Sequence, residues 1–257
     1  MAKQEKSDIG WTNITYNPFQ VVDENNKFSG WHCQKISPGC ANCYAETFNK
    51  RLGHSAYDKK LPENFNHHIN FKILHQMATS KENKYAFVSS MTDIFGDWVP
   101  DHWVWVMFDA IAQNGETQFQ LLTKRPARML DVICKYPKPL PMNVWLGATT
   151  ENQSMFDERI GALMAIKELY DRILWVSVEP MLSPVKITSG IDWVVCGGES
   201  GAKNKRRPME QEWGLDLLNQ CQKLNIPFFF KQWDCSNQAD AKKTINGKII
   251  QNYPLQK

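Results

Sequence analysis

From residue 85 onward, short apolar segments alternate with longer amphipathic ones, and this rhythm constrains the fold more than any other feature. Regular alternation of strands and helices is typical of α/β proteins with a parallel sheet. The expected strands read as nearly continuous apolar runs, as parallel strands covered on both faces do. They are Tyr85–Ser90, Gln118–Leu122, Asn143–Ala148, Arg172–Val178, Asp192–Cys196 and Pro227–Phe230.

Apolar residues at helical spacing predict helices between these strands. The expected helices are Pro100–Asn114, Pro126–Lys135, Asn152–Tyr170 and Met209–Leu224. One more strand, at Ile14–Tyr16 or Gly30–His32, brings the total to roughly seven. The sequence therefore predicts an α/β fold with mostly parallel strands, a partial or full (β/α) TIM-like barrel.

The remaining segments predict one domain over residues 1–257. It has an N-terminal cysteine loop at 33–43 and a small C-terminal extension at about 234–257. Gln20–Ser29 reads as an inserted loop, and the polar stretch Gly53–His75 as a lid or a connection. Asn246 and Gly247 predict a hairpin turn within the extension.

The chain of 257 residues has 42% hydrophobic residues, too many for a disordered protein, and a net charge of +3 that neither demands nor excludes a nucleic acid. It shows no apolar run of the roughly 18 residues that span a bilayer. Its first residues lack the apolar core of a signal peptide. We therefore expect a cytoplasmic protein without a membrane partner.

Three of the seven cysteines fall within eleven residues, as Cys33-x6-Cys40-x2-Cys43. Pro38 and Gly39 predict a turn, and Ala41–Lys50 is expected to be helical, with Cys40 and Cys43 on one face at its start. Free amides at a helix start favour thiolates, which are soft metal ligands.

Two kinds of metal site fit these cysteines. Structural zinc normally takes four protein ligands, which His32 or His54 would have to complete. Three thiolates without an evident fourth ligand instead favour an iron–sulfur cluster with one open metal corner.

Nearly every expected strand is followed by polar residues, where parallel barrels place their active sites. The charged ones are expected either to converge on one mouth or to form structural salt bridges; they are Lys124, Glu151, Glu179, Glu199 and Lys231. Asp93, Thr149 and Thr150 fit helix caps equally well. Gly197–Gly201 fits a backbone anion site, and Lys203–Arg207 either a solvated loop or a phosphate-attracting patch.

Several motifs together resemble an uncharacterised family of phages, prophages and bacteria, similar to the branch of the radical S-adenosylmethionine (SAM) superfamily that includes spore photoproduct lyase. They are Ile9-Gly-Trp11-Thr12, Asn17-Pro18, Ser37-Pro-Gly-Cys40-x2-Cys43-Tyr44-Ala-Glu46, Leu122-Thr-Lys124-Arg125-Pro126, Val144-Trp-Leu-Gly147, Glu179-Pro180, Gly197-Gly-Glu199-Ser200-Gly201 and Phe229-Phe-Lys231-Gln-Trp233. The superfamily's usual loop is Cys-x3-Cys-x2-Cys, whereas this chain has six residues between its first two cysteines.

The resemblance implies that Cys33, Cys40 and Cys43 hold a [4Fe–4S] cluster whose fourth iron binds SAM. It implies reductive cleavage of SAM to a 5′-deoxyadenosyl radical, with flavodoxin or ferredoxin as reductant and a nucleic acid or nucleotide as candidate substrate. The implied SAM-binding residues are Tyr44, Ser89, Ser90, Thr92, Glu151 and Glu179, and the catalytic candidates are Lys124, Glu199 and Lys231.

Two other hypotheses stay open. One is a zinc- or cluster-binding structural or nucleic-acid-binding protein without radical catalysis. The other is a SAM-independent hydrolase that uses Glu179 or Glu199, although no hydrolase motif supports it.

Overall fold

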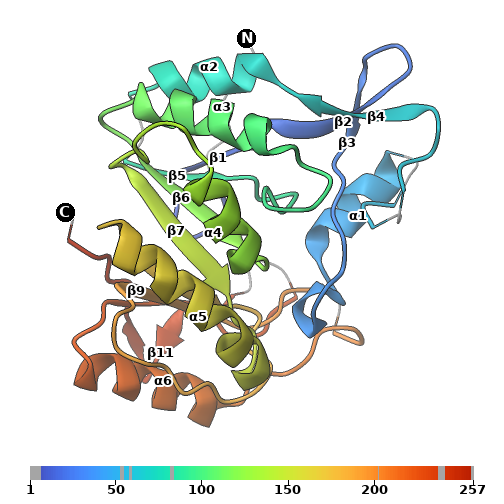
Figure 1. Cartoon of the computed structure of the whole chain (residues 1–257). Helices are drawn as coiled ribbons and strands as arrows, with labels where there is room; N and C mark the ends of the chain where they lie inside the picture. The colour runs from blue at the N-terminus through green and yellow to red at the C-terminus, as the bar shows by residue number, and fades with distance from the viewer. Residues whose placement is uncertain are drawn as a thin grey trace.

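The computed structural model describes residues 7–52, 55–57, 60–81, 84–201, 203–236 and 241–255. Seven parallel strands form one curled sheet, the half of a barrel (Figure 1). In sheet order they are β1 (Ile14–Tyr16), β5 (Tyr85–Val88), β6 (Gln118–Thr123), β7 (Val144–Thr149), β8 (Leu174–Val178), β9 (Trp193–Gly197) and β10 (Phe228–Gln232). The prediction of a partial barrel is confirmed, and the full barrel is wrong because β1 and β10 remain the two edges of the sheet.

The helices cover the outer face of this sheet (Figure 1). They are α2 (Phe71–Thr79), α3 (Asp101–Ala112), α4 (Pro126–Cys134), α5 (Gln153–Leu169) and α6 (Gln211–Lys223). Each predicted helix after residue 100 is confirmed to within two residues at either end. No helix of the described residues is long and apolar enough to cross a membrane.

Alternate residues of the strands face two separate cores, which explains why the strands read as continuous apolar runs. One core packs strand residues against the helices. The other contains no helix residue and lies on the concave face, where the indoles of Trp11, Trp175 and Trp193 meet. The ring centroids are 5.1 Å apart for Trp11–Trp175 and 5.2 Å for Trp175–Trp193. These aromatic side chains fill the interior of the half-barrel.

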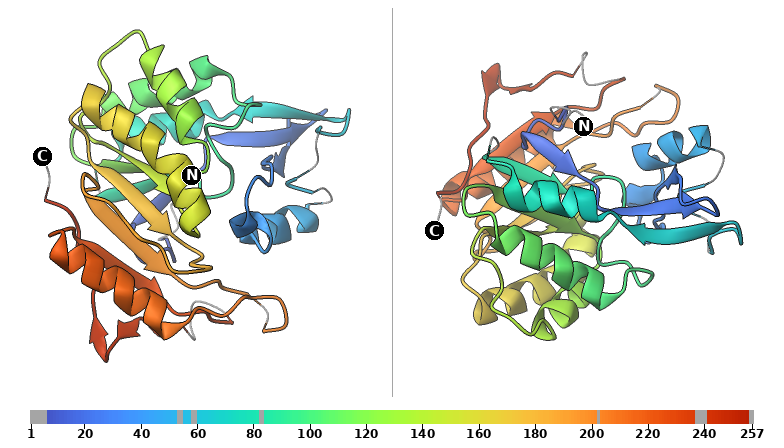
Figure 2. Two further views of the ribbon diagram at one scale, coloured as in Figure 1. Left: turned by 60° about the horizontal axis from the view of Figure 1, so that its bottom comes forward. Right: turned by 90° about the horizontal axis from the view of Figure 1, so that it is seen from above.

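Two segments expected to be irregular form a second sheet beside the first (Figure 2). Its antiparallel strands, in order, are β3 (Phe28–Gly30), β2 (Phe19–Asp23) and β4 (Phe65–Ile69). The prediction of an inserted loop at 20–29 is therefore wrong. Val21 and Val22 are buried strand residues, and a backbone hydrogen bond between Asp23 and Lys27 closes a hairpin. The additional strand of the main sheet is Ile14–Tyr16, not Gly30–His32.

The excursion at 53–75 is only partly within the described residues, since 53, 54, 58 and 59 lie outside them. Its later part forms β4 and the start of α2. This part is therefore a connection with regular secondary structure and not a lid. The expected hairpin of the C-terminal extension is confirmed as β11 (Thr244–Ile245) and β12 (Lys248–Ile249).

Candidate functional site

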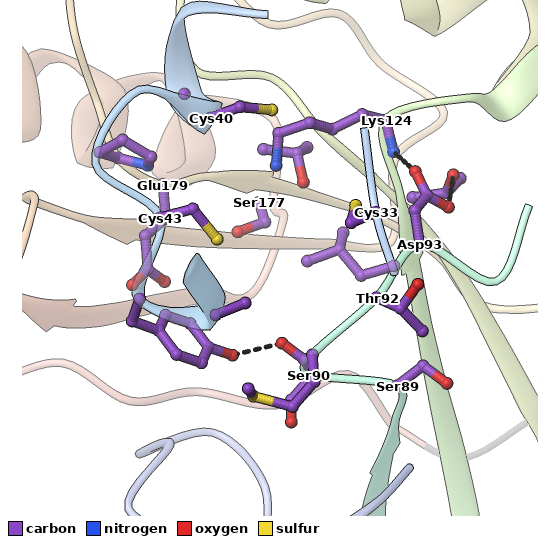
Figure 3. A pocket seen from close by; sticks show the side chains of 18 of the residues that line it. Cys33, Cys40, Cys43, Ser89, Ser90, Thr92, Asp93, Lys124, Ser177 and Glu179 are labelled. Carbon is purple, nitrogen blue, oxygen red and sulfur yellow. Dashed lines mark hydrogen bonds between the residues drawn. The ribbon is translucent and has the colours of Figure 1, made fainter. Parts of the chain in front are cut away.

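A cavity of about 220 Å³ opens where the parallel strands end, between the half-barrel and the cysteine loop. All three clustered cysteines line it, and in Figure 3 their sulfurs point into the same space. The strand ends contribute Ser89, Ser90, Thr92, Lys124, Ser177, Glu179 and Lys231 to the same lining. Residues that are more than 190 positions apart in the chain thus meet at one mouth, as the parallel topology requires.

The cysteine loop is less regular than the sequence predicts. Pro38–Cys40 forms one short 3₁₀ turn, and α1 (Tyr44–Arg51) begins only after Cys43, which caps it with extended backbone. The expectation that Cys40 and Cys43 share one helical face is therefore wrong. Asn42 explains the interruption, because its side chain donates hydrogen bonds to Glu199 and to the Lys205 carbonyl.

Tyr57 contacts the thiol cluster, although no motif in the sequence singles it out. Its hydroxyl hydrogen-bonds Cys43 and lies within electrostatic reach of Cys33 and Cys40. Burial, followed by the nearby Cys43, raises the pKa of Tyr57 above its ordinary value. Burial also raises the pKa of Cys33 to about 12, with the neighbouring Asp93 carboxylate adding to the rise. The Cys33 thiol and the Tyr57 hydroxyl therefore lie in a weakly solvated environment.

On the opposite side of the cavity, the segment after β5 supplies hydroxyl groups. Ser89 has a left-handed backbone, with φ of 64°, and its buried Oγ has no hydrogen-bond partner among the described residues. The Tyr44 hydroxyl donates to the Ser90 carbonyl at 2.5 Å. The Thr92 hydroxyl donates to the carbonyl of His32, so it fixes the residue that precedes the first cysteine of the loop.

The predicted charged residues separate into two groups. Lys124 extends into the cavity (Figure 3). Lys231 pairs with Glu179 at the cavity wall. Glu151 is fully buried behind the cysteine loop and pairs with Arg159 at 2.8 Å, so it is not part of the lining. The structural salt-bridge alternative thus holds for Glu151.

Glu199 does line the cavity, yet it pairs with Arg207 from the basic stretch. Arg206 of the same stretch pairs with Asp234 at 3.0 Å. Two of the four basic side chains in Lys203–Arg207 therefore have structural partners, whereas Lys203 and Lys205 are exposed.

The polar residues expected to cap helices have other positions. Asn152, not Thr149 or Thr150, caps α5 by accepting from the Met155 amide at 2.9 Å. Thr149 lines the cavity. Asp93 joins the ends of β5 and β6, since it accepts from the Thr123 hydroxyl at 2.7 Å and pairs with Arg125.

Gly198, directly after β9, is required by packing. A Cβ at Gly198 would lie 2.3 Å from the Asp234 nitrogen, so the two loops could not approach each other as they do. The expected role of Gly197–Gly201 as an anion site stays a prediction.

A protein-family model described as "Protein of unknown function (DUF5131)" matches residues 6–254, nearly the whole chain. The chain belongs to this family. No curated protein and no solved structure matches it. What the site of this DUF5131 member does must therefore be argued from its own residues.

The donors of this DUF5131 protein that face the cavity are three soft thiols, and the Ser89 residue lies in the same lining. Among the described residues, no group of three His, Cys, Asp or Glu side chains, the three cysteines included, is arranged to hold a metal ion. His32 directs a ring nitrogen to His67 at 2.8 Å, and His54 lies outside the described residues.

Proposed function

We propose that this protein is a radical SAM enzyme whose Cys33, Cys40 and Cys43 hold a [4Fe–4S] cluster. The observation that carries the proposal is the shared cavity: three thiols from one early loop face the carboxyl ends of a parallel half-barrel. Cysteine thiolates are the usual ligands of such clusters, and three leave one iron free to bind a further group. When bound, the cluster would supply the electron that cleaves SAM reductively to a 5′-deoxyadenosyl radical.

The protein's own residues would bind and orient SAM around that position. Ser89 offers a buried hydroxyl that has no partner in the described part of the chain, and the Tyr44 hydroxyl donates to the Ser90 carbonyl at the cavity wall. Lys124 supplies a positive charge suited to a carboxylate, and Glu179 an acceptor suited to ribose or amino groups. Lys231 pairs with Glu179 and fixes its orientation, so we assign Lys231 a positioning role.

The floor of the half-barrel supports radical chemistry because it is apolar. Trp11, Phe87 and Leu122 contribute apolar side chains to the cavity, and the indole cluster lies next to them. An apolar wall limits side reactions of a reactive intermediate. A low-potential donor such as flavodoxin or ferredoxin would supply the electron, and a nucleic acid or nucleotide remains our candidate substrate.

Metal analysis of anaerobically reconstituted protein tests the proposal. We expect a brown protein with about four irons per chain and the absorption of a [4Fe–4S] centre. Cys40→Ala should lose the colour and most of the iron. Cys134→Ala is the matched control, because Cys134 is exposed on the end of α4, outside the cavity lining, and should leave both unchanged.

Two outcomes would overturn the proposal. A colourless protein that binds one zinc ion through the same cysteines would favour the structural metal-binding alternative. A colourless protein that binds no metal and hydrolyses a substrate through Glu179 or Glu199 would favour the hydrolase.

A further inference from the structure

The cysteine loop is tied to the half-barrel through two acidic side chains, Glu151 after β7 and Glu199 after β9. We propose that these two residues form a carboxylate clamp that fixes the loop before any cofactor binds, and that neither one binds SAM or acts in catalysis. The purpose of the clamp rests on the proposed function, because a fixed loop would hold the three thiols at the spacing of one cluster.

The first half of the clamp is built around Glu151. Its Oε1 accepts from the Gly39 amide at 3.0 Å, and the Ser37 hydroxyl also hydrogen-bonds the carboxylate. Its Oε2 accepts from Arg159 Nη1 at 2.8 Å, and both side chains of this pair are buried. Glu151 therefore has its partners on the loop and on α5, not in the cavity.

Gly39 allows this close approach. A Cβ at this position would lie 2.9 Å from Oε1 of Glu151, which Arg159 holds in place, so any side chain would push the loop outward. The backbone of Gly39 is not in the left-handed region, so an alanine here would be disfavoured by this contact alone. The lack of a side chain at Gly39, next to Cys40, therefore allows the loop to lie against the Glu151 carboxylate.

The second half is built around Glu199. Its Oε2 accepts from the side-chain amide of Asn42 and from the backbone amide of Arg207, each at 2.9 Å. The Arg207 guanidinium pairs with the same carboxylate and also donates to the Pro38 carbonyl at 3.0 Å. Both oxygens of Glu199 therefore accept hydrogen bonds from the protein.

Both acids are charged at neutral pH. Burial alone would raise the pKa of each, but the hydrogen bonds and nearby positive charges outweigh it and hold both values below the ordinary one. Hydrogen bonds to an ionised acceptor are the strong ones, so the clamp can hold a loop that has little regular structure of its own.

The test disrupts the contact of the loop with each acid, by an added Cβ at Gly39 and by removal of the Asn42 side-chain amide, and it keeps both arginines. The variants are Gly39→Ala and Asn42→Ala, and the control is Gly115→Ala, whose added Cβ meets no atom within 4 Å. In metal-free protein, we would measure amide hydrogen exchange of residues 37–43 and the alkylation rates of Cys40 and Cys43 with iodoacetamide. In reconstituted protein, we would measure the rate at which a chelator removes iron.

We expect both variants to speed exchange and alkylation roughly tenfold, the change expected from losing one charge-assisted hydrogen bond. Iron loss should also be several-fold faster, and Gly115→Ala should match the wild type. Rates equal to the wild type in both variants would overturn the clamp. If Gly39→Ala does not fold, as judged by tryptophan emission, Asn42→Ala decides the question, because Asn42 is only half-buried and Glu199 keeps Arg207.

The two proposals fail differently. A wild type that takes up no iron, with faster exchange in the variants, would leave the clamp standing and refute the cluster. A wild type that loads iron, with variants unchanged in all three rates, would leave the cluster standing and refute the clamp.

Discussion

Replacing Arg159 by methionine is the most informative test of how the site is supported. Arg159 is 1% exposed and pairs with the fully buried Glu151; it also donates to the Thr149 carbonyl at 2.7 Å. Methionine retains much of the volume but leaves the Glu151 carboxylate without its hydrogen-bonded counter-charge. Breaking a buried pair in this way costs about 3–5 kcal/mol, because the remaining charge stays desolvated.

We expect the lower end of this range, about 3 kcal/mol, because Glu151 keeps the Gly39 amide and the nearby charge of Lys124. The whole folding free energy of such a domain is about 5–15 kcal/mol, so the variant should fold but be clearly less stable.

The loss should depend on pH, with a predictable sign. In the wild type the pKa of Glu151 lies below its ordinary 4.5, so its contribution to stability is present above that pH and is lost as the pH falls through the lower folded value. Without Arg159, one of the interactions that lower the pKa of Glu151 is lost, so we expect this pKa to rise. The deficit of the variant should therefore be largest near pH 7 and shrink as the pH approaches 4.5.

Urea unfolding followed by tryptophan emission at pH 7 and pH 5 measures both effects, since the chain has 10 tryptophans. A deficit below about 1 kcal/mol at pH 7 would match an exposed pair and not a buried one. A deficit of equal size at both pH values would show that the charge of Glu151 is not its cause. Either result would show that the buried Glu151–Arg159 pair does not stabilise the protein in this way.

Two further predictions concern packing and titration. Gly147→Ala should destabilise the protein by about 1–3 kcal/mol in urea unfolding, because its Cβ would lie 2.4 Å from the Trp175 indole. Gly161→Ala in α5 meets no atom within 4 Å and should stabilise by up to about 1 kcal/mol; a similar loss in both variants would contradict this account. Burial, then the charge of His32, lowers the pKa of His67 to about 4, so its ring should stay neutral in NMR spectra down to pH 5, and a midpoint near 6.5 would contradict it. Because the folded pKa is lowered, any stability His67 contributes is present above 6.5 and is lost as the pH falls toward 4.

The sequence predicted the main sheet well because periodicity reports local burial. Strands such as Val144–Thr149 are buried on both faces, so their apolar runs were unmistakable. The second sheet was missed because β4 carries exposed polar residues, among them Asn66 and His67, and its partner β2 lies more than 40 positions away. Pairing over such a distance leaves no local pattern.

The sequence predicted which residues lie near the site, but not what each of them does there. Parallel topology sends polar residues at strand ends to one mouth, which is why Lys124 and Glu179 were found. Sequence could not separate them from Glu151, whose partners Gly39 and Arg159 come from opposite sides of it in the chain. The spacing of three cysteines gave no hint that Tyr57 would hydrogen-bond one of them.

Cleavage of SAM is the direct test of radical SAM activity. Reconstituted wild-type protein would be incubated without oxygen with SAM and dithionite, and the products separated by chromatography. We expect 5′-deoxyadenosine and methionine in equal amounts, even without a substrate. A protein with a complete cluster that leaves SAM intact would contradict the proposed activity.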